Sequence, residues 1–148
     1  MDNLTTKQRH NNMASIRLKD TRPELLVRKW LWSHNYRYRL NVKSVPGKPD
    51  IVLRRYRTAI FVNGCFWLGH EDCGNYKIPK SNTDFWVNKI TKNKERDQRN
   101  YSDLSNAGWS VIVIWECQLR NNCIEETMRN VEHLLSNNLL GMYKAHSN

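Results

Sequence analysis

Three segments of the chain have the sequence features of α-helices. Thr21, followed by Pro23 and Glu24, is typical of a capped helix start, and apolar residues at helical spacing continue to about residue 35. A second helix is predicted from residue 82 or 83 to about residue 106, where an Ala-Gly pair ends it. An amphipathic segment over residues 124–135 predicts the last helix.

Other apolar residues are arranged as in strands. Residues 36–40 alternate aromatic or apolar side chains with arginine, which predicts a half-exposed strand. Residues 50–53 and 58–62 flank a charged turn and predict a β-hairpin. The uninterrupted apolar run over 111–115 predicts a central, buried strand. This order of elements indicates an α/β fold, a small mixed β-sheet flanked by helices, in a single domain over residues 1–148.

The charge of the chain points to its partner. Lys and Arg number 24 against 14 Asp and Glu, and the net charge of +10 favours a polyanion. Six Trp and a hydrophobic fraction of 39% argue against a disordered basic tail. No apolar run approaches the roughly 20 residues of a membrane span, and residues 1–10 do not form a secretory signal. We therefore expect an intracellular nucleic-acid-binding domain.

Cysteine and histidine occur at a spacing that suggests a metal site. Cys65, His70 and Cys73 lie within nine positions, and Cys117 directly follows the last predicted strand. Thiolate and imidazole ligands suit zinc, and four protein ligands leave no open position, so such a zinc would be structural. The spacing is not that of a standard zinc finger, and small buried thiols with a solvated histidine remain the alternative. Cys123 lies outside the cluster and is expected to be a spare thiol.

Three acidic residues are candidates for chemistry. Asp50 opens a strand whose partner returns through residues 60–62, where a carboxylate can hold Mg²⁺ with a backbone carbonyl or a second acid. On pattern alone, the favoured interpretation of Asp50 is an ordinary turn residue. Glu24 can be a helix-capping acid, and Asp97 can belong to the solvated face of a helix.

Two basic segments are candidates for contact with a nucleic acid. Residues 1–20 are polar and basic, with a weak helical pattern around Met13. Lys89, Asn93 and Arg96 recur at helical spacing, so one helix face can point toward DNA. A mobile arm and an ordinary exposed helix face are the respective alternatives.

Several of these features belong to longer motifs that occur in a fixed order between about residues 12 and 119. The motifs are Pro46-Gly47-Lys48-Pro49-Asp50, Phe61-Val62-Asn63-Gly64-Cys65-Phe66-Trp67, Phe85-Trp86, Lys89, Asn93, Arg96-Asp97, Gly108-Trp109 and Val113-Ile114-Trp115-Glu116-Cys117. In this order they resemble the motifs of the very-short-patch-repair DNA mismatch endonucleases. The resemblance implies a fold like that of type II restriction enzymes. It also implies a Mg²⁺-dependent nick on the 5′ side of the thymine in a T:G mismatch, the product of 5-methylcytosine deamination.

The resemblance also implies roles for individual residues. Asp50 matches the Mg²⁺-binding aspartate, and Val62 matches a position whose backbone carbonyl contributes to that site. The implied ligands of a structural Zn²⁺ are Cys65, His70, Cys73 and Cys117. The predicted catalytic residues are Asp50, Asp97, Glu24 and Asn63, and the predicted DNA-binding residues are Phe66, Trp67, Trp86, Met13, Lys89, Asn93 and Arg96. Phe66, Trp67 and Trp86 match aromatic residues that wedge into DNA beside the mismatch, although aromatic residues more often pack in a core.

Two positions depart from the family pattern. Leu68 stands where the family has the histidine that acts as general base, partnered by the aspartate matching Asp97. Asn63 replaces a second histidine, and neither leucine nor asparagine can take a proton near neutral pH. The enzyme can therefore be slow, use another base, or be a catalytically weakened or inactive, zinc-stapled mismatch-binding protein.

The resemblance and the charge together define the expected partners. The first is double-stranded DNA containing a T:G mismatch, whose backbone the basic residues 1–20 would grip. Mismatch-repair proteins are further candidate partners. We expect a monomer without membrane contact, located in the bacterial cytoplasm and associated with the nucleoid.

Overall fold

The computed structural model describes residues 21–65, 70, 78, 80–120 and 123–146. The elements are α2 (Arg22–Ser33), β1 (Ile51–Leu53), a 3₁₀-helix (Arg54–Tyr56), β2 (Thr58–Asn63), α3 (Thr83–Asn106), β3 (Ser110–Trp115), a second 3₁₀-helix (Glu116–Leu119) and α4 (Cys123–His146). Among the described residues the strands form a three-stranded sheet in the order β1-β2-β3. β1 is antiparallel to β2 and β3 is parallel to it, so the predicted mixed sheet with flanking helices is confirmed.

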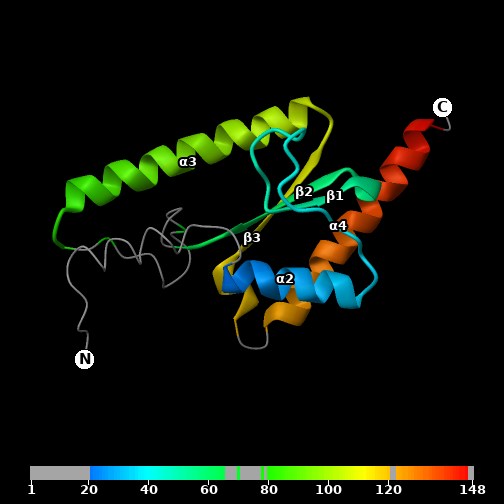
Figure 1. The fold of residues 1–148 in the computed structure, drawn as a ribbon, viewed down its shortest axis with the longest axis horizontal. Coiled ribbons are helices and arrows are strands. Elements are labelled where there is room, and N and C mark those ends of the chain that lie inside the picture. The colour runs from blue at the N-terminus through cyan, green and yellow to red at the C-terminus, as the bar shows by residue number, and fades with distance from the viewer. Residues whose placement is uncertain (1–20, 66–69, 71–77, 79, 121–122, 147–148) are drawn as a thin grey trace.

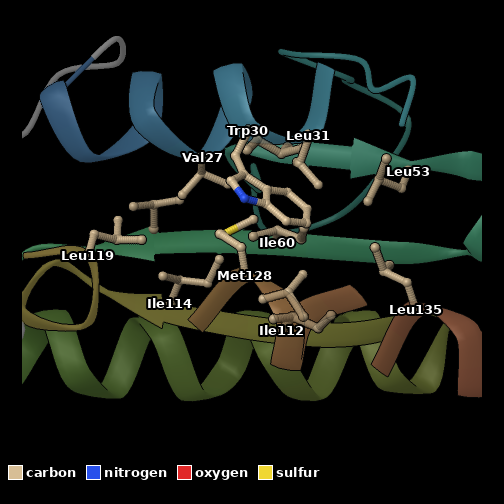
Figure 2. Close-up of a cluster of buried hydrophobic side chains, with 13 residues drawn as sticks. Val27, Trp30, Leu31, Leu53, Ile60, Ile112, Ile114, Leu119, Met128 and Leu135 are labelled. Carbon is tan, nitrogen blue, oxygen red and sulfur yellow. The ribbon is translucent and has the colours of Figure 1, made fainter. Parts of the chain in front are cut away.

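Helices cover both faces of the sheet, with α3 on one side and α2 and α4 on the other (Figure 1). Successive side chains of a strand point to opposite faces, so the strands supply two cores. In the larger core Leu31 of α2 and Met128 of α4 pack with Ile60 of β2 (Figure 2). In the smaller core Leu104 of α3 packs with Phe61. A fully buried side chain of this kind stabilises the fold by about 1.5–3 kcal/mol.

Helices α2 and α3 begin where the local sequence predicts. At the start of α2, Thr21 Oγ1 accepts a hydrogen bond from the backbone N–H of Glu24 at 3.4 Å, which satisfies a donor that lacks a helical partner. α3 begins after Asn82, but this residue adopts a left-handed conformation with φ 55° and its side chain makes no capping hydrogen bond. The Thr83 hydroxyl instead donates to the carbonyl oxygen of Lys80 at 3.2 Å.

The strand predicted over residues 36–40 is wrong. The backbone there makes an isolated antiparallel bridge, from Arg39 to Val52. Asn35 and Asn41, on either side of the segment, have φ values of 69° and 54°. Because these left-handed residues turn the chain at both ends, the alternating pattern has no room to form a longer ladder.

β3 and α4 also differ from the sequence prediction. β3 lies at the edge of the described sheet and β2 lies in its centre. In β3 only Ile112 and Ile114 are buried, and both belong to the core formed with α2 and α4. α4 continues past the predicted end to His146. Asn138 Nδ2 donates to Thr58 Oγ1 at 3.0 Å and ties the extension to β2. No helix in the described part of the chain combines the length and apolarity needed to cross a membrane.

Arg57 fixes the end of α3 against the hairpin. Its backbone has φ 48°, and its guanidinium donates from Nε to Gly108 O and from Nη2 to Ala107 O, both at 3.2 Å. The same group lies 5.0 Å from the ring centroid of Trp109. These carbonyls end a helix and attract a positive charge. Arg57 therefore ties the C-terminal end of α3 to the turn of the hairpin.

Candidate active site and metal group

Several reactive side chains of the described chain lie at one end of the strands, where β2 and β3 finish and β1 begins; we call this end the site edge of the sheet. β2 ends at Asn63, and its parallel neighbour β3 ends beside it at Trp115. β1 runs in the opposite direction, so Asp50, which precedes it, lies at the same edge. Cys65 and Cys117 follow β2 and β3 by two residues each. The topology thus brings a carboxylate and two thiols together.

Asp50 is held against the central strand. Its Oδ2 accepts a hydrogen bond from the backbone N–H of Val62 at 2.7 Å, a short distance typical of bonds to a charged acceptor. Glu24, in the first turn of α2, interacts with Asp50 through its charge and through a side-chain hydrogen bond. Glu24 is buried and its Oε2 lies 2.9 Å from Nη2 of Arg28. Two carboxyl groups therefore lie together beside this arginine.

This environment raises the pKa of Asp50 from 3.8 to about 7. Burial is the largest cause, and the negative charge of Glu24 adds to it, whereas the Val62 N–H and Arg28 act in the opposite direction. Mg²⁺ takes oxygen ligands and is commonly bound through one or two carboxylates. The donor set fits such an ion, because a divalent cation would relieve the cost of the Asp50 charge.

A row of side chains on α3 faces the same region. Asn93, Asp97 and Tyr101 are spaced by four residues and therefore lie on one face of the helix. Asn93 is buried, and Asp97 is mostly covered, with its Oδ1 3.3 Å from Nη2 of the more exposed Arg96. Asp97 is thus not part of a fully solvated helix face.

Tyr101 is the residue of this row that the sequence prediction missed. Its hydroxyl oxygen accepts a hydrogen bond from Asn63 Nδ2 at 3.0 Å. Burial raises the pKa of Tyr101, and the charges of Asp97 and Asp50 raise it further, so the three groups share one electrostatic environment. The spacing from Asp97 was the available signal, but a tyrosine at that spacing is equally typical of a core position.

The candidate DNA-binding residues of α3 do not share one exposed surface. Lys89 is half-buried and Asn93 is buried, whereas Arg96 is exposed. Trp86 is half-buried and packs edge-on against the exposed Phe85, with ring centroids 5.1 Å apart. The predicted wedge residues Phe66 and Trp67, together with Met13, Leu68 and Cys73, lie outside the described residues.

Three of the four predicted zinc ligands come together. The ligand atoms of Cys65, His70 and Cys117 all lie within 4.8 Å of one another, and Cys117 Sγ is 3.5 Å from His70 Nδ1. A tetrahedral zinc with bonds of about 2.3 Å to sulfur and about 2.0–2.1 Å to nitrogen separates such ligands by about 3.5 Å. The three residues therefore fit the ion, and the fourth predicted ligand, Cys73, lies outside the described residues.

The surroundings of this group fix its ligands. The backbone N–H of His70 donates to Cys65 O at 2.9 Å, and the His70 ring stacks on Trp115 with centroids 4.1 Å apart. Cys65 is buried, and its N–H donates to Glu116 Oε1 at 3.4 Å. Contacts of this kind orient the ligand side chains of a metal site. Cys123 is exposed and lies outside the group.

Comparison with known proteins gives one consistent result. The family model described as DNA mismatch endonuclease Vsr matches residues 1–75. The type II nicking enzyme V.NmeAIP of Neisseria meningitidis is 54% identical over 123 residues, which cover 83% of this chain and 87% of that protein. The type II nicking enzyme V.XorIIP of Xanthomonas oryzae is 44% identical, with 88% and 96% covered. The DNA mismatch endonuclease Vsr of Escherichia coli is 43% identical, with 76% and 71% covered.

Proposed function

The chain belongs to the Vsr family of DNA mismatch endonucleases, and from that premise we propose that it nicks DNA on the 5′ side of the thymine in a T:G mismatch, with Mg²⁺ as cofactor. The proposed substrate is double-stranded DNA in which 5-methylcytosine has been deaminated. We further propose a monomeric enzyme of the bacterial cytoplasm with a restriction-endonuclease-like fold in one domain.

One observation carries the catalytic part of this proposal, namely the arrangement of Asp50 against Val62. A carboxylate with a pKa raised to about 7 is bonded to the strand whose backbone is the proposed second ligand, and a second acid lies beside it. A turn aspartate bonds to backbone about two residues away, whereas Asp50 bonds to the central strand, 12 residues further along the chain. Burial and a like charge at one carboxylate are typical of functional sites.

The residues of the chain divide the proposed work among them. Asp50 and the Val62 carbonyl would hold Mg²⁺, with Glu24 supporting them. Such an ion, when bound, withdraws charge from a phosphate oxygen and makes water a better nucleophile. Asp97 and Asn63 lie in the same region and would orient the reacting groups. Asn63 is buried and Asp97 is mostly covered, which limits the water that competes with the phosphate for these hydrogen bonds.

Zinc and the aromatic residues have a separate proposed task. Zn²⁺ on Cys65, His70, Cys117 and Cys73 would hold the segment that begins at Cys65 against the end of β3. That segment carries Phe66 and Trp67, the proposed DNA wedge, with Trp86 completing it from α3. Inserting such side chains costs a few kcal/mol of unstacking and is offset by stacking of about 1–3 kcal/mol per base.

The experiment that tests this function is a nicking assay on an end-labelled duplex. The T:G duplex is compared with the T:A duplex, with Mg²⁺ or with a chelator, and binding is measured in parallel. We expect a nick in the T:G duplex in the presence of Mg²⁺. Asp50→Asn should bind but not nick, whereas Asp103→Asn, a change at an exposed residue of α3, should leave nicking intact.

A second candidate function is favoured by one residue. Leu68 occupies the position of the family's general base, and a chain without a base could bind mismatches without cutting them. A bound T:G duplex that is never nicked would establish this candidate and refute the enzyme. If the enzyme is merely slow, Leu68→His should raise the nicking rate by about 10²–10⁴-fold, which is what a positioned base contributes.

A further inference from the structure

The contact between Asn63 and Tyr101 joins the end of the central strand to α3. Asn63 is 7% exposed, and its Nδ2 donates to the Tyr101 hydroxyl oxygen at 3.0 Å. A primary amide has donors on nitrogen and an acceptor on oxygen, so fixing Nδ2 also fixes the direction of Oδ1. The contact therefore determines where the acceptor of this amide is available.

Tyr101 is itself anchored on both sides. Its ring packs edge-on against Phe61 with centroids 5.0 Å apart and an interplanar angle of 67°. Its backbone belongs to α3, one turn after Asp97. The hydroxyl thus has little freedom to move, and it holds the Asn63 amide within the field of Asp97 and Asp50. A tyrosine that only satisfied a buried amide could do so anywhere in the sheet. Asn63, however, directly follows Val62, the residue whose N–H donates to Asp50.

We propose that Tyr101 is a positioning residue for DNA hydrolysis: its hydroxyl fixes the Asn63 amide, and the fixed amide oxygen orients the water that attacks phosphorus. This inference rests on the proposed nicking function. An amide oxygen accepts a hydrogen bond from water without taking its proton, as the water-orienting glutamine of GTPases does. In the step, the water oxygen forms a bond to phosphorus and a backbone phosphorus–oxygen ester bond breaks. One water proton passes to solvent, and the leaving oxygen takes a proton from solvent.

The test is a set of single-turnover nicking rates at saturating T:G duplex and Mg²⁺. Tyr101→Phe keeps the ring on Phe61 and removes the hydroxyl, so the rate should fall by about 10–100-fold. Duplex affinity and the thermal midpoint should stay close to those of the wild type. Asn63→Ala should show a similar fall, and the double variant should be no slower than Asn63→Ala alone, because both act through one unit. Tyr56→Phe is the matched control at the far end of the hairpin and should leave the rate unchanged.

Each other outcome overturns the inference. A Tyr101→Phe rate equal to that of the wild type would show that the hydroxyl positions nothing. Rate losses that multiply in the double variant would show that Tyr101 does not act through Asn63. A rate loss accompanied by an equal loss of duplex affinity or folding would assign the pair a structural role. If the wild type binds the duplex and never nicks it, the proposed function fails first and the inference fails with it; this outcome is distinct, because in the other three the wild type nicks.

Discussion

Replacing Asp50 with asparagine should stabilise the metal-free protein while removing its response to Mg²⁺. The pKa of Asp50 in the folded chain is about 7, against an ordinary value of 3.8. The folded state therefore holds this proton more tightly than the unfolded state does. Below pH 3.8 the carboxyl is protonated in both states and there is no penalty. As pH rises, the folded chain must either keep the proton or bury a charge, so the penalty grows and is complete above about pH 7.

The size of the effect follows from the same two values. At 1.36 kcal/mol per pKa unit, the rise from 3.8 to about 7 corresponds to about 4 kcal/mol of lost stability at high pH. Asparagine has a similar shape, and its Oδ1 can still accept from the Val62 N–H. Part of the gain is offset because the attraction to Arg28 is lost. We expect Asp50→Asn to raise the free energy of unfolding by about 2–4 kcal/mol at about pH 8, and by much less at about pH 4.

Urea denaturation in the presence of a chelator, repeated across this pH range, measures the difference. Asp103→Asn is the control, because an exposed carboxylate should change stability by less than about 0.5 kcal/mol. Mg²⁺ should then stabilise the wild type in proportion to its binding, and should leave Asp50→Asn unchanged. An Asp50→Asn variant less stable than the wild type at high pH, or a difference that is the same at every pH, would refute the burial argument for this site.

Two further predictions concern zinc and DNA. Cys117→Ser should weaken zinc binding by more than about 100-fold, since even residues that only support a ligand contribute about 10–100-fold. Cys123→Ser is the control and should keep the metal content of the wild type. Equal zinc content in the two variants, measured by metal analysis, would exclude Cys117 as a ligand. Affinity for the T:G duplex should fall by about 10³-fold or more between about 50 and about 200 mM salt, because the net charge of +10 acts through phosphate contacts. Fluorescence anisotropy measures this affinity. An affinity that does not change with salt would contradict the phosphate contacts.

Local signals in the sequence were enough to predict most helices and strands. Thr21 before Pro23 and Glu24 predicted the start of α2, because capping depends on residues within one turn. The alternating residues 36–40 misled, because the pattern of side chains does not show that Asn35 and Asn41 turn the backbone on either side. An alternating pattern describes which faces are apolar and not how long the ladder is.

Burial was predicted less well than element type. The apolar run of β3 was expected at the centre of the sheet, but the strand lies at the edge of the described sheet and Val111 and Val113 are only half-buried. A short apolar run is compatible with either position, because it does not specify which neighbours the strand has. That information depends on how the helices pack around the sheet, with α2 and α4 on one face and α3 on the other.

Some residues of the candidate site are placed by the strands and others by the packing of the helices, and the first group is easier to predict. The hairpin predicted from residues 50–62 already brings Asp50 beside Val62, because antiparallel register follows from a short turn. Cys65 and Cys117 are far apart in sequence, yet both follow strands, and parallel strands end at the same edge of a sheet. Residue type and topology were therefore sufficient for the carboxylate and the thiols. Glu24 was predicted from the resemblance, but its place beside Asp50 depends on the packing of α2. Tyr101 was missed, because its contact with Asn63 depends on the packing of α3, which no local pattern encodes.

Residues placed by the sheet and residues placed by a helix can vary to different extents among chains with the same fold. The register of the sheet sets where Asp50, Val62 and the two cysteines lie. Tyr101 depends on the packing of one helix face and on a single hydrogen bond to Asn63. Side chains on α3 can therefore be exchanged while the strand register that places Asp50 stays unchanged.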